Sequence, residues 1–521
     1  MLKISVVLSF LIVWVISPST AQEGFKKEYD FGGLITSVHQ LLVKEDTLVL
    51  IGNTLTAEPN QVGVLFAKLD TLGNVLSQRI IYDTLYGGSF VFNVNFEAIA
   101  TSDGGYLIPG VLFYTPFQYF LLKLTVDGEV EFIQHLDIEE TVSVFPMHPI
   151  EVEDGYLVAG TSQVEFGGTF NGQFFVNKYD LQGNLQWNQF YGMQALEERS
   201  GTFIELHPNL FVLAGSRSNA PLIDDPDTYW TRAHILAIDS TGAFQWNWQG
   251  PNNEESYISN LLFIEDEGWI YTTSELEFEV ELYYGFRTKV VCRDLAFEKK
   301  WEHPLSTTAW QLNGTTELIY TKDHSLVTVG RWILPNAPTP YPDSVEVDRW
   351  SPTNITKLSM EGDSLWSRLD TMEIGVETSG HYLNTATILS SGSVVAAGNF
   401  DDNSVGKQKV WVIKVGKDGC LGDSCNLVSS TPFVRPPAEE TRVYPNPASQ
   451  DLYVDFGLLP QGPSTLQILN SQGVVMLEKS LAAGQSPLQR IDTARYPAGV
   501  YFYRLLEAGT LISVGQFLVV D

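Results

Sequence analysis

The sequence predicts an all-β fold: a seven-bladed β-propeller of four-stranded antiparallel blades, followed by a small Ig-like β-sandwich. A pattern of about 55 residues returns seven times between Ser37 and Asp418. Its units are short apolar runs bounded by Gly, Asp and Asn turns, and no amphipathic helical stretch competes with them. Because a closed ring leaves few exposed sheet edges, each repeat is interpreted as one blade.

Each repeat contains a first anchor, which is a turn followed by an apolar strand. The seven anchors are Asp46–Gly52, Asp103–Gly110, Asp154–Gly160, Asn209–Gly215, Glu267–Thr273, His324–Gly330 and Ser391–Gly398. A second strand and a turn follow each anchor, as in Phe175–Asp180 and Gly183. With the strand before the anchor and the outer strand after the turn, these segments give four strands per repeat. A linear solenoid is the alternative, but its ends would need polar caps, which the sequence does not show.

The two ends of the repeat array complement each other. The last repeat lacks an outer strand of the type found at residues 185–192 (LQWNQFYG), whereas Phe25–Gly33 (FKKEYDFGG) has that pattern. We therefore predict that residues near 25–31 pair with the seventh blade and close the ring.

The lengths of the connections distinguish the two faces of the predicted ring. Within a repeat, the first-to-second and third-to-fourth connections are short turns, whereas the other two connections are long and differ between copies. Because antiparallel strands alternate in direction, all long connections fall on one face. Variable loops on a rigid scaffold are where binding usually occurs, so this face is the expected binding face.

A Gly turn followed by tryptophan recurs in the repeats, most clearly in Ile238–Trp246 (IDSTGAFQW). Over about 400 residues the pattern resembles quinoprotein-like propellers with PQQ-type repeats, whose blades dock through such a tryptophan. The resemblance implies that tryptophans of this kind pack between blades: Trp187, Trp246, Trp301 and Trp366. The vicinal cysteines and cofactor-binding residues of that family have no counterpart, so no quinone chemistry is inferred and no cofactor is predicted.

The amino end has the features of an export signal. Lys3 precedes an apolar run from Ile4 to Ile16, and small residues lead to Ala21. Residues 1–21 are therefore predicted to be a signal peptide, and residues 22–428 the propeller. No other apolar stretch reaches this length, so the mature chain is expected to be soluble and to lack a transmembrane span.

The carboxyl end is a separate predicted domain. Residues 429–440 are rich in Pro and charge, typical of a linker, and residues 441–521 alternate like a small β-sandwich. The motif Tyr444-Pro445-Asn446-Pro447, the turn within Leu466–Gly473 and the strand containing Gly499 and Tyr501 resemble the C-terminal sorting domain of the type IX secretion system of Bacteroidetes. Gln516 departs from the Lys that commonly precedes the last strand.

That resemblance implies a partner and a destination. The partner is the type IX secretion machinery, and the destination is the extracellular space or the outer-membrane surface after the sorting domain is clipped. A purely structural sandwich is the alternative.

Charge excludes two classes of partner. Lys and Arg total 31 against 62 acidic residues, a net charge of −31. Nucleic acid and anionic membranes require a cationic surface, so neither is predicted as a partner.

The three cysteines predict no catalytic site. Cys420 and Cys425 are close in sequence and are expected to form a disulfide in an oxidising compartment, whereas Cys292 lies in a strand and is expected to be a buried, inert thiol.

Some short motifs have two interpretations. Asp-Thr and Asp-Ser pairs, such as Asp70-Thr71 and Asp363-Ser364, resemble the O-glycosylation signal of this bacterial group but are also simple turn formers.

Two groups of acidic loop residues could bind calcium or simply be solvated: Asp224, Asp225 and Asp227, and Asp401, Asp402 and Asn403. Neither group has an EF-hand spacing. No other metal site is predicted, because the eight histidines are scattered.

Five aromatic residues outside the repeat pattern are the candidate binding residues: Tyr229, Trp230, Trp332, Tyr341 and Trp350. Aromatic side chains stack on sugar rings or anchor protein partners, although they can equally cover a loop. No catalytic residues are predicted, since the sequence contains no nucleophile elbow and no phosphate-binding loop.

The sequence favours a non-catalytic binding module for polysaccharide or protein. One alternative is a secreted polysaccharide hydrolase or lyase, with carboxylates gathered from several blades at the channel. A second alternative is a purely structural surface protein. The propeller fold does not decide between them, because propellers host many functions.

Overall fold

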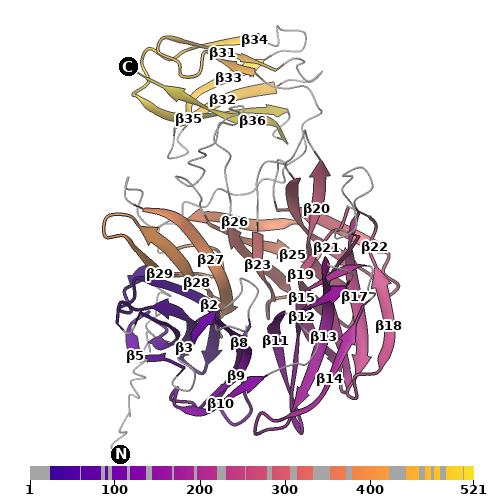
Figure 1. The fold of residues 1–521 in the computed structure, drawn as a ribbon. Helices are drawn as coiled ribbons and strands as arrows, with labels where there is room; N and C mark the ends of the chain where they lie inside the picture. Colours follow the sequence, from indigo (N-terminus) through magenta and orange to yellow (C-terminus); the bar gives the residue numbers. More distant parts are fainter. Residues whose placement is uncertain are drawn as a thin grey trace, which may run out of the picture. The chain divides into compact units, whose positions relative to one another are not determined.

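The computed structural model describes the chain as two compact units, one ending at Val428 and the other beginning at Ser429 (Figure 1). Across the described residues there are strands and turns but no helix. The described residues are 24–58, 60–83, 88–91, 97–113, 118–136, 143–166, 169–192, 196–219, 230–252, 254–278, 284–305, 314–331, 353–370, 378–421, 442–456, 464–470, 475–481, 488–507 and 510–520.

The strands of the first unit follow the repeats. Repeats one to three supply β2 (Ile35–Lys44), β3 (Thr47–Leu55), β4 (Val62–Asp70), β5 (Val75–Ile81), β6 (Ser89–Val91), β7 (Ile99–Ala100), β8 (Tyr106–Phe113), β9 (Gln118–Leu124), β10 (Val130–Leu136), β11 (Ser143–Val152), β12 (Gly155–Phe166), β13 (Thr169–Tyr179) and β14 (Leu185–Tyr191).

Repeats four to seven supply β15 (Glu197–His207), β16 (Leu210–Ser218), β17 (Thr231–Asp239), β18 (Phe244–Gln249), β19 (Ile258–Ile264), β20 (Gly268–Phe278), β21 (Tyr284–Arg293), β22 (Lys299–Pro304), β23 (Gly314–Tyr320), β24 (Ser325–Arg331), β25 (Thr353–Ser359), β26 (Ser364–Asp370), β27 (Thr378–Ile388), β28 (Val394–Asp402) and β29 (Lys407–Val415). Repeats three to six each form a separate antiparallel four-stranded sheet in chain order.

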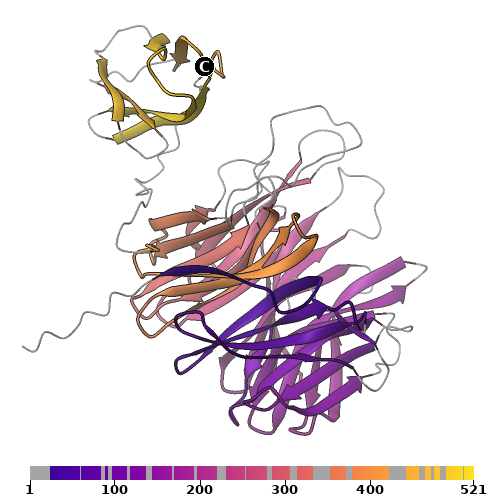
Figure 2. The same ribbon diagram turned by 90° about the vertical axis from the view of Figure 1, so that its left-hand side faces the viewer.

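The two ends of the array share one sheet. β1 (Phe25–Tyr29) pairs antiparallel with β29, and the same eight-stranded sheet contains repeat one. Figure 2 shows the N-terminal strands in indigo beside the orange strands of repeat seven. Tyr29 and Phe31 are buried in one core with Leu389 and Val412. The predicted pairing of the residues near position 25 with the last repeat is thus confirmed, and the array closes on itself unlike a linear solenoid.

Consecutive repeats dock through an aromatic side chain on the next repeat's turn. The Nε1 atom of Trp301 donates a hydrogen bond to the Met360 carbonyl oxygen at 2.8 Å, and a Cβ on Gly362 would lie 2.7 Å from the Trp301 ring. The Nε1 atom of Trp366 donates to the Lys417 carbonyl oxygen at 3.0 Å. Glycine is used in these turns because its positive φ and missing side chain let the ring approach.

The other two predicted tryptophans dock in the same way. The ring of Trp187 lies 3.1 Å from the position a Cβ on Gly242 would take. Repeat five has Phe297 where the others have Gly, at a φ of 64°, and Trp246 meets its ring edge-on at a centroid distance of 5.9 Å. The predicted packing of these tryptophans between repeats is confirmed.

A bulge recurs in the first strand of the repeats and explains the glycine that ends most anchors. The pairing register shifts at the same place in six repeats, for example between Val38 and Gln40. An added Cβ on Gly52 or Gly215 would lie 1.9 Å from a carbonyl oxygen of the bulged strand. The bulge therefore requires a residue without a side chain opposite it.

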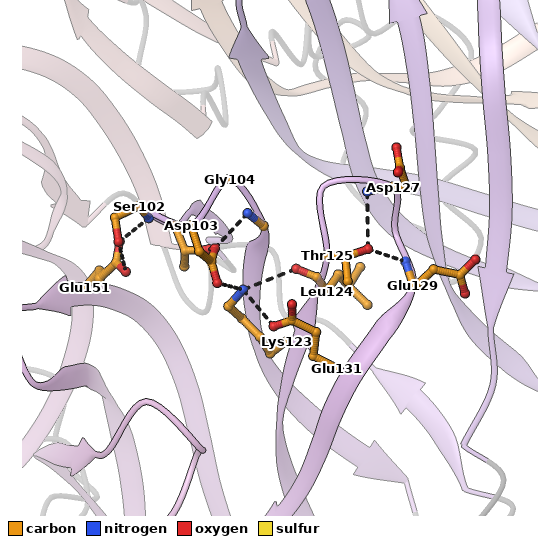
Figure 3. A network of polar contacts seen from close by, with 12 residues as sticks. Ser102, Asp103, Gly104, Lys123, Leu124, Thr125, Asp127, Glu129, Glu131 and Glu151 are labelled. Atoms are coloured by element: carbon orange, nitrogen blue, oxygen red, sulfur yellow. Dashed lines mark hydrogen bonds and ion pairs between the residues drawn. The ribbon is translucent and has the colours of Figure 1, made fainter.

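A buried lysine braces the short-turn end of several repeats. In repeat two, the Nζ atom of Lys123 lies 2.7 Å from Asp103 Oδ2 and 3.1 Å from Glu131 Oε2 (Figure 3). In repeat six, Lys357 Nζ lies 2.7 Å from Asp323 Oδ2. Each aspartate belongs to the first anchor turn and each lysine to the third strand, so the pair ties the turn to the sheet. The sequence analysis did not identify these pairs.

The second unit is a two-sheet sandwich. One sheet contains β30 (Arg442–Tyr444), β31 (Asp451–Asp455) and β34 (Leu488–Asp492); the other contains β32 (Ser464–Asn470), β33 (Val475–Leu481), β35 (Gly499–Glu507) and β36 (Thr510–Val519). Their facing side chains, among them Leu452, Ile468 and Phe517, form one buried core. This arrangement matches the small β-sandwich predicted for the carboxyl end.

Candidate functional site

Seven polar residues occupy equivalent positions at the inner edge of the first unit, and we call them the inner ring. Six of them directly follow the bulge in the first strand of their repeat, and Glu97 takes the corresponding place two residues before β7: Gln40, Glu97, His148, Thr202, Asn260, Glu317 and Thr385. The first strands of consecutive repeats contact one another, from β11 through β15, β19, β23 and β27 to β2. The chain thus brings together side chains that are far apart in sequence.

Two glutamates of the inner ring have contrasting environments. A Glu97 Oε1 atom lies 3.2 Å from His148 Nδ1. Glu317 Oε2 accepts a hydrogen bond of 3.4 Å from the Thr385 hydroxyl, which itself accepts one from the Leu41 N–H. Burial, together with the negative charge of Glu97, raises the pKa of Glu317 to about 8. At neutral pH, therefore, Glu317 is largely a protonated acid.

The chemistry open to such a pair is acid–base chemistry. A carboxylic acid that stays protonated at neutral pH can donate a proton, and a second carboxylate nearby can accept one or act as a nucleophile. Glu317 retains some exposed surface, as does Glu97. The inner ring thus carries a potential proton donor and acceptor from different repeats.

Sequence reasoning missed these residues because each stands alone in its repeat. A signal was nevertheless present: all seven repeats have a polar residue eight or nine positions before the first large apolar residue of the anchor, as Glu317 precedes Leu326. A comparison of the repeats in that register would have found the ring. The electrostatic coupling between Glu97 and Glu317, by contrast, arises only in the tertiary structure.

A second polar cluster lies at the long-connection end of repeat four. The Cζ atom of Arg232 lies 4.2 Å from the centre of the Trp230 ring, and Arg232 Nη1 donates a hydrogen bond of 3.1 Å to Gln249 Oε1. The Trp230 N–H donates to Asn219 Oδ1 at 2.8 Å. Trp230, Arg232 and Gln249 are all half-buried, so this group is partly accessible.

Buried ionisable residues lie next to Arg232 in the same sheet. Arg217 pairs in register with both Glu198 and Arg232, and its Nε atom donates a hydrogen bond of 2.7 Å to Glu198 Oε1. Burial raises the pKa of Glu198 to about 7, although Arg217 opposes the shift. Burial, with the charges of Arg217 and Arg232, lowers the pKa of His234 to about 3, so this histidine is neutral.

Of the predicted aromatic binding residues, the structure describes only Trp230. Four of the five lie outside the described residues: Tyr229, Trp332, Tyr341 and Trp350. Their role stays a prediction.

The weak calcium candidates Asp224, Asp225 and Asp227 also fall outside the described residues. In the second acidic group, Asp402 Oδ2 lies 2.8 Å from Lys409 Nζ and Asp401 Oδ1 accepts a hydrogen bond of 3.0 Å from Gln408 Nε2. Within the described ranges there is no cluster of three or more His, Cys, Asp or Glu residues that could hold a metal ion.

The cysteines are partly described. Cys420 is disulfide-bonded and Cys292 is a free, fully buried thiol. Burial raises the pKa of Cys292 to about 11, which keeps it protonated and unreactive. Cys425 lies outside the described residues, so its pairing with Cys420 stays a prediction.

Asp70 illustrates the turn-forming role of an Asp-Thr pair. Its Oδ1 atom accepts hydrogen bonds from the backbone N–H groups of Leu72, at 2.9 Å, and Asn74, at 2.8 Å. These contacts fix the turn. Glycosylation of such pairs stays a prediction.

The predicted sorting motif follows the first strand of the second unit and contacts its last strand. Asn446 Oδ1 accepts a hydrogen bond of 2.9 Å from the Leu518 N–H, and Tyr444 stacks on Tyr453. The Tyr501 hydroxyl donates to the Pro497 carbonyl oxygen at 2.9 Å. Gly499 begins β35, and Pro445 and Pro447 flank Asn446. The motif therefore joins the first strand of the sandwich to the last.

Comparison with known families identifies this second unit. Residues 442–520 match the family described as "Secretion system C-terminal sorting domain". They form a C-terminal sorting domain. A sorting domain of this kind implies the type IX secretion machinery as a partner and a place at the cell surface or in the extracellular space. The part of the chain that the structure describes contains no helix long and apolar enough to cross a membrane.

The remaining comparisons are distant. No curated protein matches the chain. The β-propeller domain of the Trilobed protease from Pyrococcus furiosus shares 7% identity, with a TM-score of 0.38 and coverage of 73% of this chain and 94% of that chain. A member of the duf4221 family from Bacteroides vulgatus shares 8%, with a TM-score of 0.35 and coverage of 76% and 96%.

An α-L-arabinofuranosidase of Fusarium graminearum shares 10% identity, with a TM-score of 0.36 and coverage of 55% of this chain and 84% of that chain. Because all these similarities are low, the description of the fold rests on the strand pairing of this chain.

Proposed function

We propose that the first unit is a seven-bladed propeller that acts outside the cell as a non-catalytic binding module for a polysaccharide or protein. Repeat seven would be completed by β1, giving seven groups of four strands. PQQ-type repeats are part of this proposal, since the aromatic-on-turn docking matches what the resemblance implies. The signal peptide and an origin in Bacteroidetes belong to the same proposal.

The observation that carries the binding proposal is the accessible group of Trp230, Arg232 and Gln249 at the long-connection end of repeat four. Among the described residues, this group does not recur at the long-connection end of another repeat, so the docking between repeats does not account for it. An aromatic ring with an arginine and an amide beside it offers stacking and hydrogen bonds, which sugars and protein side chains both use.

The test is a binding screen with the full chain starting at Gln22. We expect selective binding on a glycan array, weakened at least tenfold by Trp230→Ala. Folding of the variant is checked by its melting temperature. Absence of binding to any glycan, from folded protein, would reject the polysaccharide form of the proposal, and a pull-down with surface extracts would then test the protein form.

A second candidate is a secreted polysaccharide hydrolase or lyase, and the specific observation in its favour is the pair Glu97 and Glu317. In glycoside hydrolysis, one carboxyl group donates a proton while another acts as base or nucleophile. Glu317 would be the acid and Glu97, beside His148, the base. Release of reducing ends or unsaturated products from a polysaccharide panel, abolished by Glu317→Gln and by Glu97→Gln, would support this candidate. No release from any substrate would reject it.

A further inference from the structure

Among the arginines of the first unit whose side chains the structure describes, only Arg232 lacks a carboxylate partner. The five other arginines with described side chains in residues 24–421 each have a carboxylate oxygen within 2.7 Å: Arg79, Arg199, Arg217, Arg293 and Arg368. No carboxylate pairs with Arg232 among the described residues. In a chain with a net charge of −31, acidic groups are abundant, so a partly buried arginine without one is unexpected.

The donors that Arg232 leaves unused lie on one edge of its guanidinium group. Nη1 is engaged by Gln249 Oε1, whereas Nε is buried and has no hydrogen-bond partner, and no contact to a described residue involves Nη2. The Nε–Nη2 edge offers two parallel N–H groups, which match the two oxygens of a carboxylate. An unpaired buried donor destabilises the fold, and a ligand oxygen would satisfy it.

The surroundings hold Arg232 in place without neutralising it. Trp230 covers the guanidinium plane, and its backbone is fixed to Asn219 by hydrogen bonds of 2.8 and 3.3 Å. Glu198 is committed to Arg217, through Oε1 contacts to both Nε and Nη2. His234 is buried against Phe174 and its ring nitrogens have no hydrogen-bond partners. Among the described residues, the positive charge of half-buried Arg232 is therefore not balanced by a carboxylate.

We propose that Trp230, Arg232 and Gln249 form a subsite for the carboxylate of an acidic sugar unit, a uronate within a polysaccharide. The carboxylate would accept two hydrogen bonds from the free edge of Arg232. The sugar ring would lie against the indole of Trp230, and Gln249 keeps the arginine oriented. This inference rests on the proposed binding function and specifies its ligand class.

The experiment measures binding of the full chain, from Gln22, to two soluble probes by isothermal titration calorimetry: an oligogalacturonate and the neutral oligogalactoside of the same length. A dextran sulfate oligomer of matched charge is the third arm. Arg232→Gln removes the proposed ligand group. Arg199→Gln is the control, because it removes one positive charge from the same repeat at an exposed position. Melting temperatures establish that each variant is folded.

We expect the uronate to bind at least tenfold more tightly than the neutral probe, Arg232→Gln to lose at least tenfold of that affinity, and Arg199→Gln to stay within twofold. Raising the salt concentration should weaken uronate binding. Equal binding of neutral and uronate probes, unaffected by Arg232→Gln, would overturn the subsite but leave the binding function standing. Binding of the sulfated probe alone would overturn the carboxylate assignment. Absence of binding to all three probes would overturn the subsite, whereas the glycan array and the pull-down would still decide the proposed binding function.

Discussion

The two ends of the repeats differ in whether their side-chain contacts recur from one repeat to the next. The short-turn end repeats the same contacts: aspartate–lysine braces, glycine turns and an aromatic ring docked on the next turn. At the long-connection end, the stacking of Arg232 on Trp230 occurs once among the residues that the structure describes. Contacts that hold neighbouring repeats together must recur in every repeat, whereas a binding group needs to occur only once. The difference separates the scaffold from the candidate site.

The largest expected effect comes from opening the ring. A chain starting at Leu34 lacks β1, which exposes the edge of β29 and removes the docking of Phe25 and Tyr29 on Gly73. We expect the melting temperature to fall by about 10 °C or more, by differential scanning calorimetry. A synthetic peptide of residues 22–33 added in trans should restore part of the loss. An unchanged melting temperature would show that β1 does not close the ring.

The next effect tests the glycine opposite the bulge. In Gly215→Ala, the new methyl group would lie 1.9 Å from the Arg199 carbonyl oxygen, so strand β15 must shift. We expect a loss of about 2–3 kcal/mol in the free energy of unfolding, measured with urea. The control is Thr273→Ala at the equivalent position of repeat five, where a Cβ is already accommodated. A change there as large as that of Gly215→Ala would contradict the explanation.

The third-largest loss of stability is expected when the aspartate–lysine brace at the short-turn end is removed. Asp323→Asn leaves the buried Lys357 without a carboxylate and is expected to cost about 2 kcal/mol. Asp103→Asn should cost less, because Lys123 keeps Glu131 as a partner. Hydrogen bonds from Lys357, Thr321 and Ser325 hold the pKa of Asp323 below its usual range.

A lowered pKa means that the brace of Asp323 stabilises the fold above pH 3.8, the usual carboxyl pKa, and loses this effect as the pH falls below it. Urea unfolding at pH 7 and at pH 3 should therefore show a smaller difference between wild type and Asp323→Asn at the lower pH. Equal differences at both values would contradict an ionic brace.

The inner ring should show the opposite dependence on pH. The pKa of Glu317 is raised from 4.5 to about 8, so the folded chain holds a proton that the unfolded chain releases. Stability from this residue is present below pH 4.5 and is lost as the pH rises toward 8. Glu317→Gln should remove this loss, on the order of 2 kcal/mol between pH 5 and about pH 6.5. Glu361→Gln, at an exposed turn, is the control and should leave the pH profile unchanged.

The smallest effect compares the closing seam with an internal one. The hydroxyl of Tyr29 donates to the Gly73 carbonyl oxygen at 2.7 Å, and that of Tyr191 donates to the Gly242 carbonyl oxygen at the same distance. Tyr29→Phe and Tyr191→Phe should each cost about 1 kcal/mol. Equal costs would show that the seam between the chain's ends is as well formed as an internal seam. A negligible cost for Tyr29→Phe alone would indicate a weaker closure.

Much of the fold could be predicted because it depends on local sequence patterns. The strand order within repeats three to six, the short turns and the pairing of residues near 25 with repeat seven follow from alternation, turn residues and the match between Phe25–Gly33 and residues 185–192. The sorting domain was recognised from Tyr444–Pro447 and the strand at Gly499. Such features depend on residues that are close in sequence, or on one motif that recurs.

Only the tertiary structure decided which side chains meet. Glu97 and Glu317 are more than 200 residues apart, and the raised pKa of Glu317 requires both burial and the charge of Glu97. Likewise, the register of three strands pairs Arg217 with Glu198 and leaves Arg232 without a carboxylate among the described residues. Periodicity determines the strands and turns, whereas burial and charge balance depend on which strands become neighbours.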